Sequence, residues 1–336
     1  MTNEMRAVGY TKSLPIEDPS SLIDVMLPRP IPGGHDLIVE VRAVSVNPVD
    51  VKRRARSDPA GAIKVLGYDA AGVVREVGSD VSLFAPGDEV FYAGSIDRPG
   101  ANSEFHAVDE RIVGHKPASL SFAEAAALPL TSLTAWEGLF DKLRLKPEGV
   151  GTLLVVGASG GVGSIVLQLA KQLVPGVRIV GTSSSPESDE WVRALGADEL
   201  VNHRAGLLDE VRRVAPEGID NIFTTHTAGQ VDTFIEILKP FGQVVAIDDP
   251  QSLDIVPFKP KALSWHWEFM FARPVNHAED LVRQHQILDE VSALVDAGRV
   301  RTTATRVLGP IDAAQLREAH RLVETGHVIG KVVVAN

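Results

Sequence analysis

A glycine-rich turn between an apolar strand and a helix constrains the fold of this chain more than any other feature. Thr152–Val156 is a short apolar run rich in β-branched residues, long enough for one buried strand. Gly157-Ala158-Ser159-Gly160-Gly161-Val162-Gly163 follows, and apolar residues then recur at helical spacing as far as Lys171. A strand, a glycine turn and a helix in this order predict a dinucleotide-binding unit.

Each part of the turn has a physical role in such a unit. Gly160 would let the backbone approach a pyrophosphate, and Gly163 would let the helix pack close to the strand. The N-terminus of the helix offers N–H groups and a partial positive charge to phosphates. The first glycine of the usual fingerprint is replaced by Ala158, so the pattern is not met literally. A plain strand-to-helix turn remains the alternative.

Strands and helices alternate on the C-terminal side of this turn. We predict strands at Leu153–Val156, Arg178–Thr182, Glu199–Val201, Asn221–Thr224, Gln243–Ile247 and Leu263–Phe269, and helices at 161–173, 186–195, 206–214, 229–238 and 277–297. Short connections between strands and helices predict a doubly wound parallel sheet. Six strands is the number in a full Rossmann sheet.

The segments before and after this region read as β-rich. Residues 1–115 contain short strands separated by Gly and Pro turns, with Asn47-Pro48-Val49-Asp50 predicted as a turn. Near Ser121 a capping-box pattern starts a helix, and a second helix is predicted over 132–145. A strand, a helix and a final strand, Gly330–Ala335, close the chain. We therefore expect an α/β protein in which a β-rich domain is interrupted by the cofactor domain, with a ligand cleft between them.

Composition excludes several classes of function. The net charge of −11 argues against nonspecific binding to nucleic acid or anionic membranes. The absence of cysteine excludes disulfides, thiolate catalysis and cysteine-ligated zinc. No apolar run reaches the ~18–20 residues that span a bilayer. The N-terminal residues MTNEMRAVGYTK lack an apolar signal core, so we expect a cytoplasmic protein.

The end of the second Rossmann strand bears on the choice of cofactor. An NAD-preferring fold usually has Asp or Glu about 20 residues after the glycine turn, but Thr182 is followed by Ser183-Ser184-Ser185 here. Hydroxyls can donate to a 2′-phosphate, with a basic partner from Arg193, Lys171 or Arg204, so the sequence favours NADPH. Ser185 also fits a helix N-cap before Pro186, and both roles are compatible.

Several ordered motifs identify a family. They are Asn47-Pro48-Val49-Asp50, Gly67-Tyr68-Asp69-Ala70-Ala71-Gly72, Pro86-Gly87-Asp88-Glu89-Val90, Ala127-Leu128-Pro129, Thr134-Ala135-Trp136, Gly160-Gly161-Val162-Gly163, Leu195-Gly196-Ala197-Asp198 and Gly330-Lys331-Val332-Val333. Over nearly its whole length the chain resembles the medium-chain dehydrogenase/reductase superfamily. Within it, the chain is similar to the zinc-independent NADPH:quinone reductases and to a subgroup labelled "zinc-type alcohol dehydrogenase-like", of which Leu263–Phe271 is typical.

The resemblance implies a Rossmann doubly wound parallel sheet inserted in a GroES-like catalytic domain. We expect the GroES-like domain at 1–128 and 299–336 and the Rossmann domain at 129–298. The zinc dehydrogenases of this superfamily bind catalytic zinc through Cys, His and Cys and have a separate four-cysteine site. At the matching positions stand Asn47, Tyr68 and Leu130, which do not form a zinc site, so we expect no metal.

Three residues are the catalytic candidates. By resemblance, Asn47 and Asp50 lie beside the substrate, where Asn47 could donate to a carbonyl or to the nicotinamide ribose. Asn47 also suits a turn before Pro48, and Asp50 could instead position that loop. Tyr68 is either a hydrogen-bond donor to substrate or a core aromatic residue. The basic run Lys52–Arg56 is either a solvated face or an attractor of anions.

The candidates for cofactor binding lie mostly at the carboxyl ends of the Rossmann strands. They are Thr134, Ser159, Gly160, Gly161, Val162, Gly163, Thr182, Ser183, Ser185, His203, Thr225, Thr227 and Lys331. Thr134 and Lys331 enter by resemblance, and a helix cap and a solvated strand lysine are their respective alternatives.

The sequence thus predicts a metal-free, NADPH-dependent oxidoreductase that transfers hydride to quinones or activated α,β-unsaturated carbonyls. A non-catalytic NADPH-binding or sensor protein is one alternative, and a zinc alcohol dehydrogenase is another. The apolar, aromatic stretch Leu263–Phe271 is predicted as an edge strand that pairs with a second copy, which would make the protein a homodimer.

Overall fold

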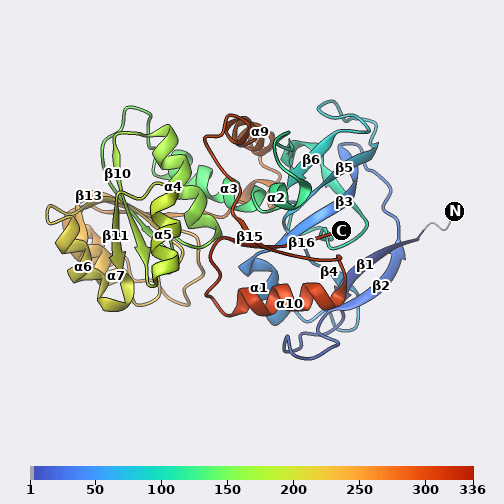
Figure 1. The fold of residues 1–336 in the computed structure, drawn as a ribbon, viewed down its shortest axis with the longest axis horizontal. Helices are drawn as coiled ribbons and strands as arrows, with labels where there is room; N and C mark the ends of the chain where they lie inside the picture. Colours follow the sequence, from blue (N-terminus) through green and yellow to red (C-terminus); the bar gives the residue numbers. More distant parts are fainter. Residues whose placement is uncertain (1–3) are drawn as a thin grey trace. The chain divides into compact units, whose positions relative to one another are not determined.

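The computed structural model describes residues 4–336 and divides the chain into two compact units (Figure 1). Unit 1 comprises the residues up to Leu130 together with Phe271–Asn336, and unit 2 comprises Thr131–Met270. Unit 2 is therefore an insertion in the sequence of unit 1, as the alternation of predicted elements suggests.

Unit 2 is built on a six-stranded parallel sheet with the strand order β11-β10-β9-β12-β13-β14. The strands are β9 (Gly151–Val156), β10 (Val177–Ser183), β11 (Glu199–Asn202), β12 (Ile219–Thr224), β13 (Leu238–Ala246) and β14 (Ser264–Trp267). Counted from the glycine turn, this is the order 3-2-1-4-5-6 of a Rossmann sheet. The predicted doubly wound parallel sheet is confirmed.

Helices cover both faces of this sheet. The helical elements of this part of the chain are α3 (Pro129–Trp136), which starts at the unit boundary, the π-helical η2 (Glu137–Lys142), α4 (Gly161–Leu173), α5 (Pro186–Ala194), η3 (His203–Ala205), α6 (Leu207–Val214), α7 (Val231–Ile237) and η4 (Val256–Lys261). Residues of α6, α7 and η4, including Val211 and Phe234, bury a core against Leu154, Val180 and Ile222 of the sheet. Helices α4 and α5 pack on β9, β10 and β11.

Unit 1 contains two sheets. One has the order β2-β1-β4, and the other has the order β15-β16-β3-β5-β6-β8 with β7 paired to β3. The strands are β1 (Glu4–Tyr10), β2 (Ile23–Pro28), β3 (Asp36–Val46), β4 (Lys64–Val65), β5 (Ala70–Val77), β6 (Glu89–Tyr92), β7 (Phe105–Asp109), β8 (Val113–His115), β15 (Ala304–Leu308) and β16 (Lys331–Ala335). The C-terminal β16 pairs antiparallel with β3, so the two sequence segments of unit 1 form one sheet.

The predicted turn at Asn47–Asp50 is a helix start instead. The helices of unit 1 are α1 (Pro48–Arg56), η1 (Glu110–Ile112), α2 (Phe122–Ala126), α8 (Ala272–Val275), α9 (Arg283–Asp296) and α10 (Ala313–Glu324). Asn47 is the N-cap of α1, Pro48 occupies its first turn, and Asp50 accepts the backbone N–H of Asn47. Asn and Pro serve helix starts as well as turns, which explains the difference.

Residues 271–298, expected in the Rossmann domain, pack with unit 1. Buried apolar residues of α9, such as Ile287 and Leu288, lie against β8 and η1. His285 of α9 contacts the carbonyl of Val113 at 2.7 Å through Nδ1, and Asp289 accepts the backbone N–H of His115 at 2.8 Å. The predicted helix over 277–297 is present in shortened form, but its partners could not be read from its pattern.

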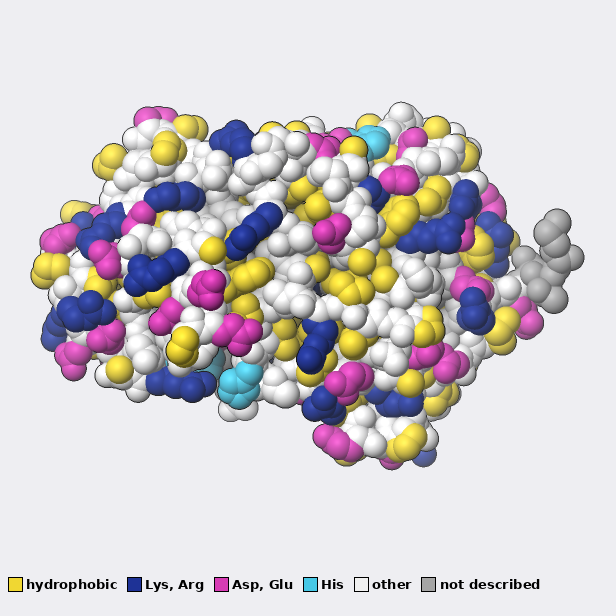
Figure 2. Space-filling model, viewed as in Figure 1, with side chains coloured by type: hydrophobic (Ala, Val, Ile, Leu, Met, Phe, Trp, Pro, Cys, Tyr) yellow, Lys and Arg dark blue, Asp and Glu magenta, His cyan; other side chains and the backbone are white. Residues whose placement is uncertain are grey.

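No helix within residues 4–336 is long and apolar enough to cross a membrane. On the face drawn in Figure 2, Lys and Arg side chains are interspersed with Asp and Glu side chains. On this face the acidic side chains are therefore mixed with basic ones and do not gather over one element.

Candidate functional site

The glycine turn of unit 2 has the geometry of a phosphate-binding turn. Gly157 has a φ of 81°, and a Cβ there would lie 2.1 Å from Oγ1 of Thr225. A Cβ on Gly163 would lie 2.3 Å from the carbonyl oxygen of Gly157, so this glycine is required by the packing of α4 on β9. A Cβ on Gly160 would meet only that same oxygen, at an ordinary 3.5 Å. The protein itself therefore does not require glycine at position 160.

Gly160 is also the N-cap of α4, where it supplies no side chain to the first turn of the helix. Gly161 and Val162 lie in that turn, and Ser159, just before it, is half-buried. The N–H groups of a helix start attract anions. The residues present thus fit the pyrophosphate of a dinucleotide.

The end of β10 supports the turn and places hydroxyls beside it. The hydroxyl of Thr182 accepts the N–H of Gly157 at 2.9 Å. Ser185 caps α5 by accepting the N–H of Ser188 at 3.2 Å, as its position before Pro186 predicts. The hydroxyl of Ser183 donates to Asp189 of α5 at 2.5 Å. A carboxylate that the sequence analysis missed therefore lies beside the predicted 2′-phosphate site.

The sheet register selects among the basic residues proposed for that site. Ser183 pairs with Asn202 at the end of β11, and His203 and Arg204 follow directly in η3. Lys171 lies in the last turn of α4, where its ammonium pairs with Asp198 at 2.5 Å. Arg193 similarly lies in the last turn of α5, at the far end from Ser185. Arg204 is thus the basic candidate that the fold brings to the end of β10.

His203 lies among the same groups. Partial burial and the neighbouring positive charges of Arg204 and His226 lower the pKa of His203 below its ordinary value. It is therefore a neutral side chain at pH 7 unless a phosphate binds beside it.

The remaining predicted cofactor residues of unit 2 lie in the loop that follows β12 and on α3. Thr225 is half-buried with its hydroxyl against Gly157. Thr227 is buried and its hydroxyl donates to Asp248 at 2.5 Å, while its N–H donates to the same carboxylate at 2.7 Å. Thr134 is buried on α3. Thr225 is the member of this group that the fold places against the glycine turn.

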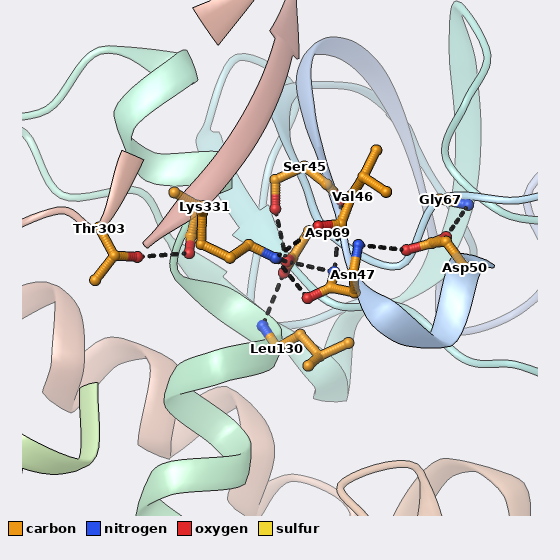
Figure 3. Close-up of polar contacts among 10 residues, drawn as sticks. Ser45, Val46, Asn47, Asp50, Gly67, Asp69, Leu130, Thr303 and Lys331 are labelled. Carbon is orange, nitrogen blue, oxygen red and sulfur yellow. Dashed lines mark hydrogen bonds and ion pairs between the residues drawn. The ribbon is translucent and has the colours of Figure 1, made fainter. Parts of the chain in front are cut away.

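A buried polar cluster in unit 1 contains three other predicted residues, Asn47, Asp50 and Lys331 (Figure 3). The register of β16 against β3 pairs Val332 with Val46, which brings Lys331 beside Asn47. The Lys331 ammonium donates to Oδ1 of Asn47, to Oδ2 of Asp69 at 2.9 Å and to the carbonyl oxygen of Val46 at 3.3 Å. Lys331 is only 4% exposed, so its predicted contact with a cofactor would require these bonds to change.

Asp69 is the centre of this cluster. Its Oδ2 accepts from the hydroxyl of Ser45 and from the side-chain amide of Asn47, each at 2.8 Å, as well as from Lys331. Its Oδ1 accepts the backbone N–H of Leu130 at 2.8 Å. Asn47 is thus engaged through both its amide nitrogen and its amide oxygen, and its contact with a substrate stays a prediction.

Asp50 is fully buried and bonded by backbone groups. Its carboxylate accepts the N–H of Asn47 at 2.9 Å and the N–H of Gly67 at 3.0 Å. Burial raises the pKa of Asp50 to about 7, against the lowering effect of these two bonds and of the positive Lys331. Asp50 positions the start of α1 and the Gly67 loop, which agrees with the loop-positioning alternative, and its direct contact with substrate stays a prediction.

Tyr68 is buried with its ring 5.5 Å from that of Phe271, at 74°. Burial raises the pKa of Tyr68 above its ordinary value, although the positive Arg53 opposes this. The guanidinium carbon of Arg53 lies 5.9 Å from the centre of the Tyr68 ring.

The residues at the zinc-ligand positions of the related dehydrogenases do not fit zinc. Asn47 has its amide committed to Asp69 and to an ammonium group, Leu130 offers no side-chain donor, and Tyr68 carries a protonated phenol. Within residues 4–336, no group of three His, Cys, Asp or Glu side chains could hold a metal ion.

Asp69 was not predicted as a functional residue, and Arg54 belongs to the basic run that was predicted either as a solvated face or as an attractor of anions. Arg54 is buried and pairs with Glu324 of α10, so this residue is not part of a solvated face. Asp69 and Lys331 each lie within an apolar run, Leu66–Val74 and Gly330–Ala335. Because a buried charge needs a partner of opposite charge, an Asp in one apolar run and a Lys in another indicate that the two residues pair.

Family models match two stretches of the chain. Residues 33–137 match the alcohol dehydrogenase GroES-like domain, and residues 195–334 match the zinc-binding dehydrogenase domain. A zinc-type alcohol dehydrogenase-like protein of Staphylococcus aureus is 37% identical over 98% of this chain and 99% of its own length. A 2-methylene-furan-3-one reductase of Solanum lycopersicum is 31% identical over 99% of this chain and 79% of its own length.

Solved structures agree with these matches. A Rhizobium etli protein assigned to the zinc-dependent alcohol dehydrogenases is 51% identical, with a TM-score of 0.95 over 99% of this chain and 98% of that one. The quinone oxidoreductase of Coxiella burnetii is 26% identical, with a TM-score of 0.82 over 99% of both chains.

Proposed function

Because this chain belongs to the medium-chain dehydrogenase/reductase superfamily, in its zinc-independent, quinone-oxidoreductase-like group, we propose that it is an NADPH-dependent reductase of quinones or activated α,β-unsaturated carbonyl compounds. Membership in this superfamily makes the chain an oxidoreductase with a nucleotide-binding fold. The substrate class and the preference for NADPH are our proposal.

The observation that carries the proposal is the open glycine at the start of α4. No atom of residues 4–336 requires glycine at position 160, whereas Gly157 and Gly163 are required by their surroundings. A pyrophosphate that lies against the turn would explain why position 160 is glycine, because a side chain there would approach the phosphates. The partial positive charge at the N-terminus of α4 would stabilise the pyrophosphate. NADPH, when bound, supplies a hydride, and the protein must orient it toward the acceptor.

The groups at the end of β10 support NADPH but also limit the preference. Arg204, Ser185 and His203 can bond a 2′-phosphate. Asp189, which accepts the hydroxyl of Ser183, would instead repel the phosphate or accept a ribose hydroxyl. We therefore propose that the protein uses NADPH preferentially and retains measurable use of NADH.

The donor set at the zinc-equivalent positions favours substrates that need no Lewis acid. An amide, a phenol and a leucine side chain do not polarise a simple ketone as zinc does. Quinones and activated enones accept hydride more readily, and they need mainly orientation and a hydrogen bond to the oxygen that gains charge. The tomato reductase and the Coxiella quinone oxidoreductase carry these two substrate types in their names.

A steady-state assay tests the proposal. Purified protein is mixed with 1,4-benzoquinone or members of a small enone panel, and NADPH and NADH are compared. We expect turnover with at least one acceptor and a higher kcat/KM for NADPH. Tight NADPH binding without turnover of any acceptor would favour the non-catalytic sensor, and stoichiometric zinc in the purified protein would favour the zinc dehydrogenase.

We further propose a cytoplasmic homodimer that pairs through β14. This strand is the last in the sheet of unit 2, and Trp267 at its end and Phe269 two residues later are about half-exposed. An apolar strand at a sheet edge invites pairing with another strand. Light scattering of the wild type and of Trp267→Lys tests this, with a dimer and a monomer as the respective expected results.

A further inference from the structure

Two buried donors on side chains that lie beside each other in unit 1 have no acceptor among residues 4–336: the hydroxyl of Tyr68 and Nε of Arg53. Nε of Arg54 and the ring nitrogens of His320 are also buried without a partner there. Leaving a buried donor unpaired costs about 1–3 kcal/mol, and nearly all such groups in folded proteins are paired. Two unpaired donors on neighbouring side chains, 5.9 Å apart from guanidinium carbon to ring centre, therefore require an explanation.

The other tyrosines show that unit 1 can satisfy such groups. The chain has three tyrosines. The hydroxyl of Tyr10 donates to the carbonyl oxygen of Ser57 at 3.0 Å, and that of Tyr92 lies 3.1 Å from Nδ1 of His106. Tyr68 is the tyrosine whose buried hydroxyl donates to no acceptor among residues 4–336, and Arg53 beside it can only donate.

Both unpaired donors are held on fixed supports. Arg53 lies on α1, where Nη2 donates to the carbonyl oxygen of Ile96 at 3.0 Å. Tyr68 lies between Gly67, whose N–H is bonded to Asp50, and Asp69, which is bonded to Lys331. Such support keeps a binding group in its productive orientation.

The two donors have the chemistry of an oxyanion-binding pair. A guanidinium N–H and a phenol O–H both bond strongly to an oxygen that carries negative charge. Because burial raises the pKa of Tyr68, its hydroxyl remains a proton-bearing donor at neutral pH. Both Nη atoms of the neighbouring Arg54 are bonded, to the carbonyl oxygen of Leu14 and to Glu324, and its Nε, like that of Arg53, has no partner among residues 4–336. Of the two arginines, Arg53 is the one that lies over the Tyr68 ring.

We propose that Nε of Arg53 and the hydroxyl of Tyr68 together bind the substrate oxygen that becomes negative during reduction. This inference rests on the proposed function and adds to it a second donor, Arg53. The ligand class is a conjugated carbonyl compound, such as a quinone or an enone, whose reduced form is a phenolate or an enolate. In an enone the hydride adds to the β-carbon and the electron pair of the C=C bond shifts so that the carbonyl oxygen becomes the enolate oxygen. In a quinone the hydride adds to one carbonyl oxygen, and the other oxygen becomes the phenolate. The two donors hold the oxygen that gains the negative charge, and a proton from solvent completes the reduction.

The variants Tyr68→Phe and Arg53→Met test the proposal, and Tyr92→Phe is the matched control because it removes a buried hydroxyl that has a partner. The probe is 4-nitrophenol, a stable mimic of the reduced product, bound to the NADP⁺-loaded protein. Its phenolate is followed by absorbance as pH is varied. We expect wild type and Tyr92→Phe to lower the pKa of the bound probe by about one unit or more, and both test variants to lose that shift.

Two further measurements, the melting temperature and kcat, distinguish a binding role of Tyr68 and Arg53 from a structural role. Removing an unpaired donor should leave the melting temperature of Tyr68→Phe unchanged or higher, whereas Tyr92→Phe should lower it. With an active acceptor, kcat should fall roughly 100-fold in both test variants. The inference is overturned if the wild type does not shift the probe, if all variants shift it equally, or if Tyr68→Phe is destabilised as much as Tyr92→Phe.

Failure of the inference and failure of the proposed function are distinguishable. A probe shift that depends on Tyr68 and Arg53, without turnover of any acceptor, would support the oxygen-binding pair and contradict the reductase. Turnover that is unaffected by either variant would support the reductase and contradict the pair.

Discussion

The ammonium nitrogen of Lys331 lies 2.9 Å from Oδ2 of Asp69, with side-chain exposures of 4% and 0%. The two residues are 262 positions apart in the sequence. Because Lys331 begins β16 and Asp69 precedes β5, the pair joins the two sequence segments of unit 1. Its partners, Asn47, Ser45 and the N–H of Leu130, supply the bonds that make a buried ion pair tolerable.

Lys331→Met should destabilise the protein strongly, because it leaves the Asp69 carboxylate buried without a compensating charge. The expected loss is about 3–5 kcal/mol, measured by chemical denaturation. Arg321→Met, which breaks the exposed pair with Glu318, is the control and should change the stability far less, because water screens an exposed ion pair. A Lys331→Met protein as stable as the control would show that the pair is not needed for unit 1.

Gly160→Ala and Gly163→Ala should separate cofactor binding from folding. At position 163 a methyl group overlaps the backbone of Gly157, so that variant should unfold at a clearly lower temperature. At position 160 the methyl group meets no close atom of residues 4–336, so folding should be preserved. The affinity for NADPH should fall tenfold or more, which corresponds to a loss of about 1.4 kcal/mol or more in binding free energy. Calorimetric titration and thermal unfolding of the two variants check this. Unchanged NADPH affinity in Gly160→Ala would contradict the proposed position of the pyrophosphate.

Arg204→Gln should weaken NADPH binding and leave NADH binding unchanged. A charge-assisted bond to the 2′-phosphate is worth about 1.5–3 kcal/mol, so we expect a loss of roughly tenfold or more in NADPH affinity. Arg193→Gln, at the far end of α5, is the control. Asp189→Asn should act in the opposite direction, because it removes a carboxylate beside Ser183. Equal losses for both cofactors in Arg204→Gln would argue against a 2′-phosphate contact.

The sequence was most informative where structure is local. The strand, glycine turn and helix from Gly151 to Leu173 could be predicted because a period-3.6 pattern follows a buried strand directly. The parallel sheet of six strands could be predicted from the alternation of strands and helices with short connections, whereas the order of its strands comes from the structure. In unit 2, predicted and observed elements differ mainly at their ends.

Contacts that depend on distant residues could not be predicted in the same way. Asn47 and Asp50 suit a turn and a helix start equally, and the helix is stabilised by packing of α1 on α10 and by the Arg54–Glu324 pair. The pairing of Lys331 with Asp69 depends on the register of β16 against β3. The packing of α9 on β8 depends on His285 and Asp289 meeting residues more than a hundred positions away.

That last contact makes part of the stability of unit 1 depend on pH. The hydrogen bond to Asp289 raises the pKa of His115 above its ordinary 6.5. Although burial opposes it, the bonds from His115 hold the pKa of Asp289 below its ordinary 3.8. The stabilisation of the folded state by protonated His115 is fully present below pH 6.5, and it is lost as the pH rises through the higher pKa of His115 in the folded protein. The stabilisation by ionised Asp289 is fully present above pH 3.8, and it is lost as the pH falls through the lower pKa of Asp289 in the folded protein.

The coupling between His115 and Asp289 should therefore be largest between pH 3.8 and 6.5. Both side chains are partly exposed, so we expect about 1 kcal/mol or less. A double-mutant cycle with His115→Gln and Asp289→Asn, measured at acidic and alkaline pH, isolates this energy. Because Nε2 of His285 also lies 3.5 Å from Asp289, the cycle is repeated in a His285→Gln background. A coupling energy that does not fall at alkaline pH would mean that the contact is held by packing on Phe84, whose ring centre lies 4.6 Å from that of His115, rather than by charge.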